Sequence, residues 1–306
     1  MKLLLFGDAH VRGTTPKSRL DDYPTALWNK FQQISKIIVE RNIDAVLNTG
    51  DLFDIPDLST SIVNKYLELF VSWKVPVYSV VGSHDKFGYN DNTLLRTALG
   101  TLMAAGVVKI VNETECIGFN TLLAGVSHSY SLDENSNDYF RSKGTLKDFM
   151  IQLCHGMVVD KPWIYGKHTL INNIKTDADL IVCGHYHPGF KETKINNTTF
   201  INIGSLGRVE RTPRLYSPRV LYINTNTPGQ EFLEHILLKC SEDEKIFIEK
   251  EEKPQTIIEV NNFIETLKQQ IDKFEPGNLK ELVVAIGKQG NYSKEIIEEA
   301  LKYIEK

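Results

Sequence analysis

The stretch VPVYSVVGSHD, residues 75 to 85, begins as an apolar run of strand length and breaks at Gly82 into a serine, a histidine and an aspartate. A single turn of this composition is common on protein surfaces. Here the same arrangement of an apolar run ending in ligand-type residues recurs at four other places in the chain. We therefore interpret residues 75 to 85 as a strand that delivers polar side chains to a functional site.

The four other apolar runs also end in carboxylates or imidazoles. They lead into Gly7-Asp8-Ala9-His10, Thr49-Gly50-Asp51, His155-Gly156 and Gly184-His185-Tyr186-His187. Because ligands of open α/β sheets bind at the carboxyl ends of the strands, we expect these side chains to gather at one edge. Carboxylates and imidazoles together suit divalent Mn, Fe or Zn, and this set exceeds what one ion needs. A pair of ions holding a phosphate is suited to phosphoester hydrolysis.

The wider hydrophobic pattern predicts a layered α/β fold with mixed sheets flanked by helices. Several predicted strands are apolar on both faces, as sheets covered on both sides by helices require. Amphipathic helices are predicted over 25–42 and 59–73. Strands are predicted over 2–6, 45–48, 75–81, 107–111, 121–126, 149–154, 179–184, 199–204 and 219–224.

The pattern of the sequence changes near residue 228. We expect a large catalytic domain over 1–228 and a small α/β cap or partner-docking domain over 229–306, because the tail alternates strand and helix patterns and carries none of the polar strand ends. The final stretch, EIIEEALKYIEK, has helical spacing of its apolar residues and suits either a docking helix or the completion of the cap.

Composition restricts the classes of protein that remain. The chain has 306 residues, a formal net charge of −4 and four widely spaced cysteines with no CxxC pair. Binding of nucleic acid through bulk positive charge, a disulfide framework and a zinc finger are therefore not indicated. No apolar run is long enough for a signal peptide or a membrane span, so we expect a cytoplasmic protein, in the host cytoplasm if the chain is phage-encoded.

In order along the chain, the polar strand ends read GDAH (7–10), GDLFD (50–54), GSHD (82–85), CHG (154–156) and GHYH (184–187). This order resembles the calcineurin-like metallophosphoesterase superfamily, whose pattern runs DxH, GDxxD, GNHD or GNHE, a later H, and GHxH. The resemblance implies the metallophosphoesterase fold, with the nuclease-type domain over 1–228, and two divalent metal ions, with Mn²⁺ expected. It implies that one ion is held by Asp8, His10 and His187, the other by His155 and His185, and that Asp51 bridges them.

The same resemblance implies catalytic roles for two further residues. His84 would lie beside the scissile phosphate and stabilise the transition state or protonate the leaving oxygen. Asp54, three residues after the bridging carboxylate, would orient it, since a carboxylate beside an imidazole holds the ring and favours its charged form. The GDLFD motif, the aspartate of GSHD and the small trailing domain resemble the SbcD-type nuclease subunit of DNA double-strand-break repair complexes. This resemblance covers residues 1 to about 225 and extends only loosely to the tail.

The chain departs from the family pattern at Ser83, where the family has an asparagine that ligates the second metal. A hydroxyl on a shorter side chain is a weaker ligand. We expect looser binding of the second ion with activity retained, because every other ligand is present. The alternative is an inactive descendant that keeps only a binding role.

Basic residues offer candidate DNA contacts. Arg208, Arg211 and Arg214 follow the last motif strand closely, and Arg12 lies in the loop after His10. Such side chains suit contacts to a DNA backbone. The alternative is a solvated loop whose arginines pair with Glu210 and other surface acids.

The leading hypothesis is a manganese-dependent DNA exonuclease or endonuclease acting in DNA end processing, recombination or double-strand-break repair. Resemblance to SbcD-type proteins implies a homodimer and an SbcC-type coiled-coil ATPase partner. Two alternatives remain open: a protein phosphatase or small phosphodiesterase of the same fold, which the acidic net charge favours, and a weakened scaffold that binds DNA or the ATPase.

Overall fold

The computed structural model describes residues 1–146, 148–163, 166–211, 215–227, 232–241 and 246–248, and beyond these only residues 284, 297, 298 and 301. The chain divides into a first unit, Met1–Ile248, and a second unit, Glu249–Lys306. Residues 249–306 of the predicted cap belong to the second unit, and nearly all of them lie outside the described residues.

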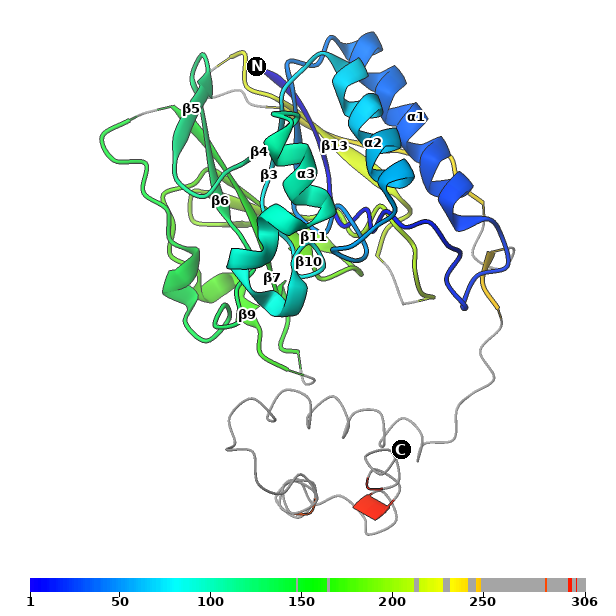
Figure 1. Ribbon diagram of the computed structural model, residues 1–306. Coiled ribbons are helices and arrows are strands. Elements are labelled where there is room, and N and C mark those ends of the chain that lie inside the picture. Colours follow the sequence, from blue (N-terminus) through cyan, green and yellow to red (C-terminus); the bar gives the residue numbers. More distant parts are fainter. Residues whose placement is uncertain are drawn as a thin grey trace. The chain divides into compact units, whose positions relative to one another are not determined.

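Two six-stranded mixed sheets form the body of the first unit (Figure 1). In each sheet four neighbouring strands run parallel, and antiparallel pairing adds the remaining strands, at one edge of the first sheet and at both edges of the second. In spatial order the first sheet contains β14 (Phe232–Leu237), β13 (Arg219–Asn224), β1 (Lys2–Phe6), β2 (Ala45–Asn48), β3 (Val77–Ser79) and β4 (Val108–Ile110). The second contains β11 (Phe190–Ile195), β12 (Thr198–Asn202), β10 (Leu180–His185), β7 (Phe149–Gly156), β6 (Thr121–Val126) and β5 (Glu115–Gly118). A small parallel pair is formed by β8 (Val158–Val159) and β9 (Thr169–Leu170).

Three α-helices, α1 (Tyr23–Arg41), α2 (Thr60–Trp73) and α3 (Ala98–Ala104), pack on the first sheet, with α1 and α2 side by side in Figure 1. The Asp22 side chain caps α1 by accepting from the amide of Thr25, and Asn42 ends it in the left-handed conformation. Four short 3₁₀ helices complete the described elements: Phe87–Tyr89, Asp91–Arg96, Ser136–Tyr139 and Ile171–Asn173. None of the described helices is long and apolar enough to cross a membrane.

Alternation along the strands divides the apolar residues between separate cores. In β1, Leu3 and Leu5 face the second sheet, while Leu4 and Phe6 face the helices. The predicted burial of both strand faces is therefore confirmed, but its expected cause is not. One face of each sheet is covered by the other sheet, and helices cover the outer face of the first sheet.

The first unit extends further along the chain than residue 228. Strand β14 pairs with β13 over its whole length, with Tyr222 opposite Glu234, and so belongs to the first sheet. Residues up to Ile248 belong to the same unit. The predicted boundary at 228 thus falls between β13 and β14, two strands that pair in the first sheet. Strands β5, β11 and β14 and helix α3 are short elements that the sequence analysis did not predict.

The core between the two sheets predicts a large effect of side-chain truncation. Leu153, in the centre of β7, is fully buried there. We expect Leu153→Ala to lower the free energy of unfolding by about 2–5 kcal/mol, because lost apolar contact and a residual cavity add together. Urea denaturation measures this. The matched control is Leu95→Ala, since Leu95 is 76% exposed and should change stability by no more than about 0.5 kcal/mol. Equal effects at both positions would contradict the two-sheet core.

Candidate metal centre

The carboxyl ends of β1, β2, β3, β7 and β10 bring the predicted ligands of both sheets together. Three overlapping groups of ligand atoms form there, with the atoms of each group within 4.8 Å of one another. All seven residues that the sequence analysis assigned to the metals lie in or against these groups. The groups are Asp8, His10, Asp51 and His187; Asp51, His155 and His185; and His10, Asp54 and His84.

Asp51 belongs to two of these groups and is the point where the two halves of the site meet. Its Oδ2 lies 3.8 Å from Nε2 of His10 and 3.2 Å from Nε2 of His155. His10 comes from the first sheet and His155 from the second, so this carboxylate lies across the seam between them. This is the placement that a bridging ligand requires.

Backbone hydrogen bonds tie the strand ends together. The amide of His10 donates to the carbonyl of Asp51, and the amide of His185 donates to Oδ1 of Asp8 at 2.8 Å. In the first group, Nε2 of His10 and Nε2 of His187 are 2.9 Å apart. These contacts hold the ligand loops in one arrangement.

Four of the predicted ligand residues have left-handed backbones. Asp8, His10, Asp51 and His185 have φ values of 48°, 49°, 47° and 73°. Non-glycine residues rarely adopt this conformation, and it persists only where the surrounding structure holds it. The concentration of such residues at the strand ends marks this edge as the functional edge.

Glycines permit the close approach that the site needs. A Cβ at Gly82 would lie 2.0 Å from Oδ1 of Asp51 and 2.1 Å from its amide nitrogen. A Cβ at Gly50 would lie 2.5 Å from Nδ1 of His155. No side chain therefore fits at either position without moving Asp51 or His155.

The donor set fits divalent cations. Asp8 and Asp51 are each 1% exposed, and within the described part of the chain their ion-pairing partners are all histidines rather than lysine or arginine. His155 Nδ1 donates to the carbonyl of Thr49 at 2.7 Å, which leaves Nε2 facing Asp51 and Nδ1 of His185, each 3.2 Å away. With a cation bound, the ring would be neutral and would offer the lone pair of this nitrogen to the cation. Converging lone pairs and buried carboxylates are stabilised when cations lie among them.

The pKa values follow from the same crowding. Burial raises the pKa of Asp8 to about 6. Burial alone would raise the pKa of Asp51 as well, but the charge of His155 and its hydrogen bond hold it well below its usual range. Burial lowers the pKa of His155, yet the Asp51 carboxylate outweighs it and raises that pKa to about 9. Burial and the neighbouring His155 lower the pKa of His185 to about 4. Asp51 and His155 thus each favour the charged form of the other.

Ser83 lies beside the shared carboxylate. Its Oγ is 3.3 Å from Oδ2 of Asp51, and the amide of His84 donates to Oδ1 of the same side chain at 2.8 Å. The loop is held by Asp85, which accepts from the amides of Gly82 and Phe53 at 2.8 Å and 3.2 Å. Asp85, which the sequence analysis gave no role of its own, therefore sets the position of both Ser83 and His84.

His84 and Asp54 are in contact, but not as the sequence analysis expected. Nδ1 of His84 donates to the backbone carbonyl of Asp54 at 2.7 Å. The Asp54 carboxylate instead lies 3.3 Å from Nδ1 of His10 and 3.0 Å from Nη1 of Arg12. Burial alone would raise the pKa of Asp54, but these two neighbours lower it. The carboxylate–imidazole dyad is thus formed with His10, and His84 is positioned by a carbonyl.

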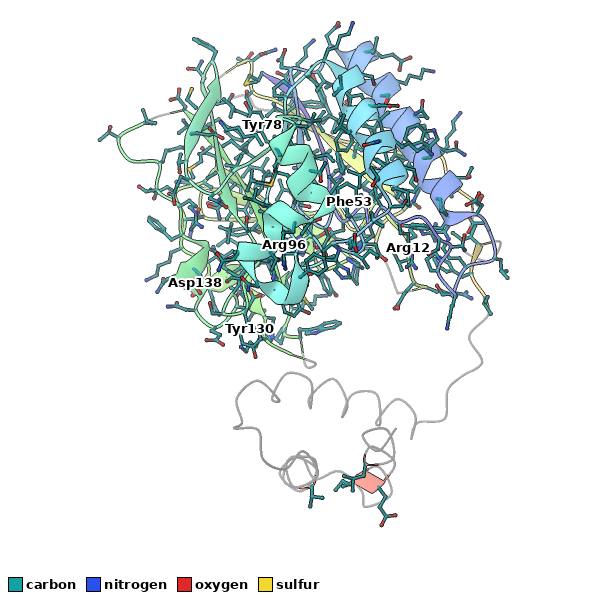
Figure 2. All side chains as sticks on the ribbon, in the orientation of Figure 1. Arg12, Phe53, Tyr78, Arg96, Tyr130 and Asp138 are labelled. Carbon is teal, nitrogen blue, oxygen red and sulfur yellow. The ribbon has the colours of Figure 1, made fainter. Side chains whose placement is uncertain are left out.

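The four arginines predicted to contact DNA lie in different environments. Arg12, which Figure 2 labels, forms the ion pair with Asp54 described above. Arg208 is only 3% exposed; its Nη1 lies 3.4 Å from the carbonyl of Ser241 and its guanidinium lies over the ring of Phe247. Its expected contact with DNA is therefore not supported by its position. Arg211 is half-buried, and Arg214 lies outside the described residues.

His128 is a histidine of this edge that the sequence analysis missed. It follows β6, and its ring lies 5.6 Å from that of His185 and 5.3 Å from that of Tyr89. Burial lowers its pKa to about 3, and its Nδ1 is buried without a hydrogen-bond partner. The run TLLAGV followed by a polar residue and a histidine carries the same signal as the five predicted strand ends.

The close approach at Gly82 predicts a defect in metal binding. Gly82→Ala should displace Asp51, and we expect the affinity for Mn²⁺, measured by isothermal titration calorimetry, to fall by at least about tenfold. The matched control is Gly166→Ala, because a Cβ at Gly166 meets nothing within 4 Å. Unchanged Mn²⁺ affinity in Gly82→Ala would show that Asp51 does not bind the metal in this position.

Comparison with known proteins gives weak likenesses to individual relatives. The DNA double-strand break repair protein Mre11 of Sulfolobus acidocaldarius is 21% identical over 199 residues, which cover 63% of this chain and 51% of that protein. The match thus spans about half the length of the relative. A dimetal phosphatase from Danio rerio is similar in structure with a TM-score of 0.47 and 11% identity, over 77% of this chain and 99% of that one. A protein from Thermus thermophilus gives a TM-score of 0.46 and 13% identity, over 76% of this chain and 98% of that one.

The family itself is clear. The model of the family described as calcineurin-like phosphoesterase matches residues 1–189, more than half of the chain and the stretch that contains all the ligand-bearing strand ends. Members of this family use divalent metals, and the described structure provides clusters that can hold them. The chain belongs to the calcineurin-like phosphoesterase family and is a metal-dependent phosphoesterase.

Proposed function

We propose that this phosphoesterase is a DNA exonuclease or endonuclease of the SbcD type, acting in DNA end processing, recombination or double-strand-break repair. The observation that carries the proposal is the two overlapping ligand groups that share Asp51. A centre built this way suits two divalent ions about a phosphodiester. The likeness to the Mre11 relative supports DNA as the substrate.

Two ions in this centre, for which we propose Mn²⁺, would lower the pKa of water and offset the charge of the phosphate. In this proposal Asp8, His10 and His187 hold one ion, His155 and His185 hold the other, and Asp51 bridges them. Ser83 lies against the shared carboxylate and takes the place of an additional ligand to the second ion.

His84 acts on the departing oxygen. It is exposed at the rim of the centre, and its Nδ1 proton is engaged by the Asp54 carbonyl. The remaining nitrogen, Nε2, is therefore the one that faces substrate, and it can donate a proton only when the ring is charged. Asp54 acts as a positioning residue, through its carbonyl toward His84 and through its carboxylate toward His10.

A small phosphodiesterase or protein phosphatase is the second candidate. Two of the arginines expected to contact DNA are engaged within the protein, Arg12 by Asp54 and Arg208 by Ser241 and Phe247. With a net charge of −4, the chain has little bulk attraction for DNA. A DNA-binding or ATPase-binding scaffold is the third candidate, and it rests on Ser83 alone.

We also propose a homodimer and an SbcC-type ATPase partner, as the resemblance implies. The segment expected to dock the partner lies in the second unit, outside the described residues. Hydrolysis by the chain alone can therefore be compared with hydrolysis in the presence of such an ATPase.

Substitution of Asp51 tests whether the centre catalyses hydrolysis. We expect hydrolysis of end-labelled linear double-stranded DNA in Mn²⁺, and we expect Asp51→Asn to lower the rate by at least about a hundredfold, because both ions lose a charged ligand. Asp138→Asn, at an exposed aspartate labelled in Figure 2, is the matched control. Hydrolysis of a phosphopeptide or a cyclic nucleotide, with none of DNA, would favour the second candidate.

The residue at position 83 should set the Mn²⁺ concentration that hydrolysis requires. Replacing it by the asparagine of the family pattern adds a carbonyl oxygen within reach of the second ion, so we expect Ser83→Asn to lower the half-saturating Mn²⁺ concentration roughly tenfold. A manganese titration of the DNA hydrolysis rate measures this. Ser83→Ala is the control and should leave the requirement unchanged or raise it. An inactive wild type that Ser83→Asn rescues would support the scaffold.

A further inference from the structure

A cavity of about 310 Å³ adjoins the metal centre on the side of His84. Ser83 and His84 form the part of its lining that belongs to the centre. Ile55 and Pro56, just after the second ligand loop, form one side, and Gly88 and Tyr89 form the other. The cavity is thus a space next to the phosphate position rather than part of the ligand set.

The lining of the cavity combines apolar side chains with polar ones. Ile55 is 48% exposed and Tyr89 51% exposed, so both present apolar surface to solvent beside the centre. The charged groups of the lining are engaged within the protein. The Asp54 carboxylate pairs with Arg12, and the buried ammonium group of Lys86 contacts Asp91 and the carbonyl of His128.

The loop that carries Tyr89 is built to hold its ring in place. Gly88 and Tyr89 both have positive φ, 54° and 56°, and for a tyrosine this conformation is uncommon. Thr93 fixes the loop by accepting from the amide of Phe87 and donating to the carbonyl of Asn90. The Tyr89 ring packs 5.3 Å from the ring of His128, which itself lies beside His185. The Tyr89 ring therefore lies between solvent and the centre, in the loop that leads to the 3₁₀ helix ending at Arg96, which Figure 2 labels.

An anchored, half-exposed aromatic ring next to a phosphodiester site is suited to stacking. Base–aromatic stacking is favourable for every nucleobase, because each has a π face, and it needs no positive charge. A cavity of this size is at the small end of ligand sites, which run from about 300 Å³ upwards. It accommodates one planar ring system but not a duplex, so its occupant must be unpaired.

We propose that the cavity between Tyr89 and Ile55 holds an unpaired nucleobase adjacent to the scissile phosphate, stacked on Tyr89. This inference rests on the proposed nuclease function and makes it more specific. It assigns single-stranded DNA, or a frayed or flipped end of a duplex, as the strand that reaches the centre. It also accounts for substrate binding by a chain in which Arg12 and Arg208 are engaged internally.

The test compares two single-stranded substrates of equal length, a thymidine oligomer and an abasic oligomer of tetrahydrofuran phosphates, hydrolysed by the full chain in Mn²⁺. The measured quantity is the ratio of KM for the abasic oligomer to KM for the thymidine oligomer. Wild type should give a ratio between about fivefold and a hundredfold, the range expected for one stacked base. Tyr89→Ala and Tyr89→Leu should bring the ratio close to one, whereas Tyr89→Phe should keep it.

The matched control is Phe119→Ala. Phe119 is 78% exposed in the turn between β5 and β6, at the end of β6 opposite to the centre, and its loss should leave the ratio as in wild type. Thermal melting of each variant checks that the loop change has not unfolded the chain. Tyr89→Leu keeps the bulk that contacts His128 and so separates loss of stacking from loss of packing.

Three outcomes would overturn the inference. A wild-type ratio of one, with both oligomers hydrolysed, shows that the base is not recognised. A high ratio that survives in both Tyr89→Ala and Tyr89→Leu shows that recognition lies elsewhere. Hydrolysis of bis(p-nitrophenyl) phosphate with no hydrolysis of either oligomer removes the nuclease proposal itself, and the inference with it. The first two outcomes leave the nuclease function standing, so the two failures are distinguishable.

Discussion

The burial of Asp51 at the seam between two sheets is the constraint on which the site depends. A carboxylate with so little exposure is unfavourable unless charge and hydrogen bonds compensate it. Here the compensation comes from both sheets at once: His155 from β7, and the amide of His84 from the loop after β3. The centre is complete only when the sheets are packed, because neither sheet alone supplies both partners.

The packing of the sheets in turn supports a strained edge. Left-handed non-glycine residues each cost about 1–3 kcal/mol, and several of the ligand residues are of this kind. The loops that contain them are held by hydrogen bonds between neighbouring strand ends, such as His10 to Asp51 and His185 to Asp8. Burial of apolar side chains in the large core between the sheets provides the free energy that offsets this strain. Strain and ligand position are therefore parts of one arrangement.

Around this centre, backbone carbonyls orient histidine rings, a role that the sequence motif suggests for side chains. The carbonyl of Thr49 orients His155, and the carbonyl of Asp54 orients His84. The Asp54 carboxylate is then available to His10 and Arg12, which explains why an arginine placed after the first motif is not free to contact DNA. A linear pattern shows which residues are near a site, but it does not distinguish a carboxylate from the carbonyl of the same residue.

Most of the longer strands and helices, the edge at which the candidate ligands gather and the family were predictable from the sequence, because each depends on local periodicity and on residues spaced along single strands. Strand β1 and helix α2, for example, were predicted within a residue of their bounds. Three features became visible only in the folded chain: the two sheets cover each other's inner faces, β14 belongs to the first sheet, and Arg208 is buried against the ring of Phe247. The tertiary structure also decided the placement of His128 and Tyr89 beside the ligands. These features depend on contacts between residues far apart in the chain, and burial looks alike in sequence whether a helix or a sheet provides it.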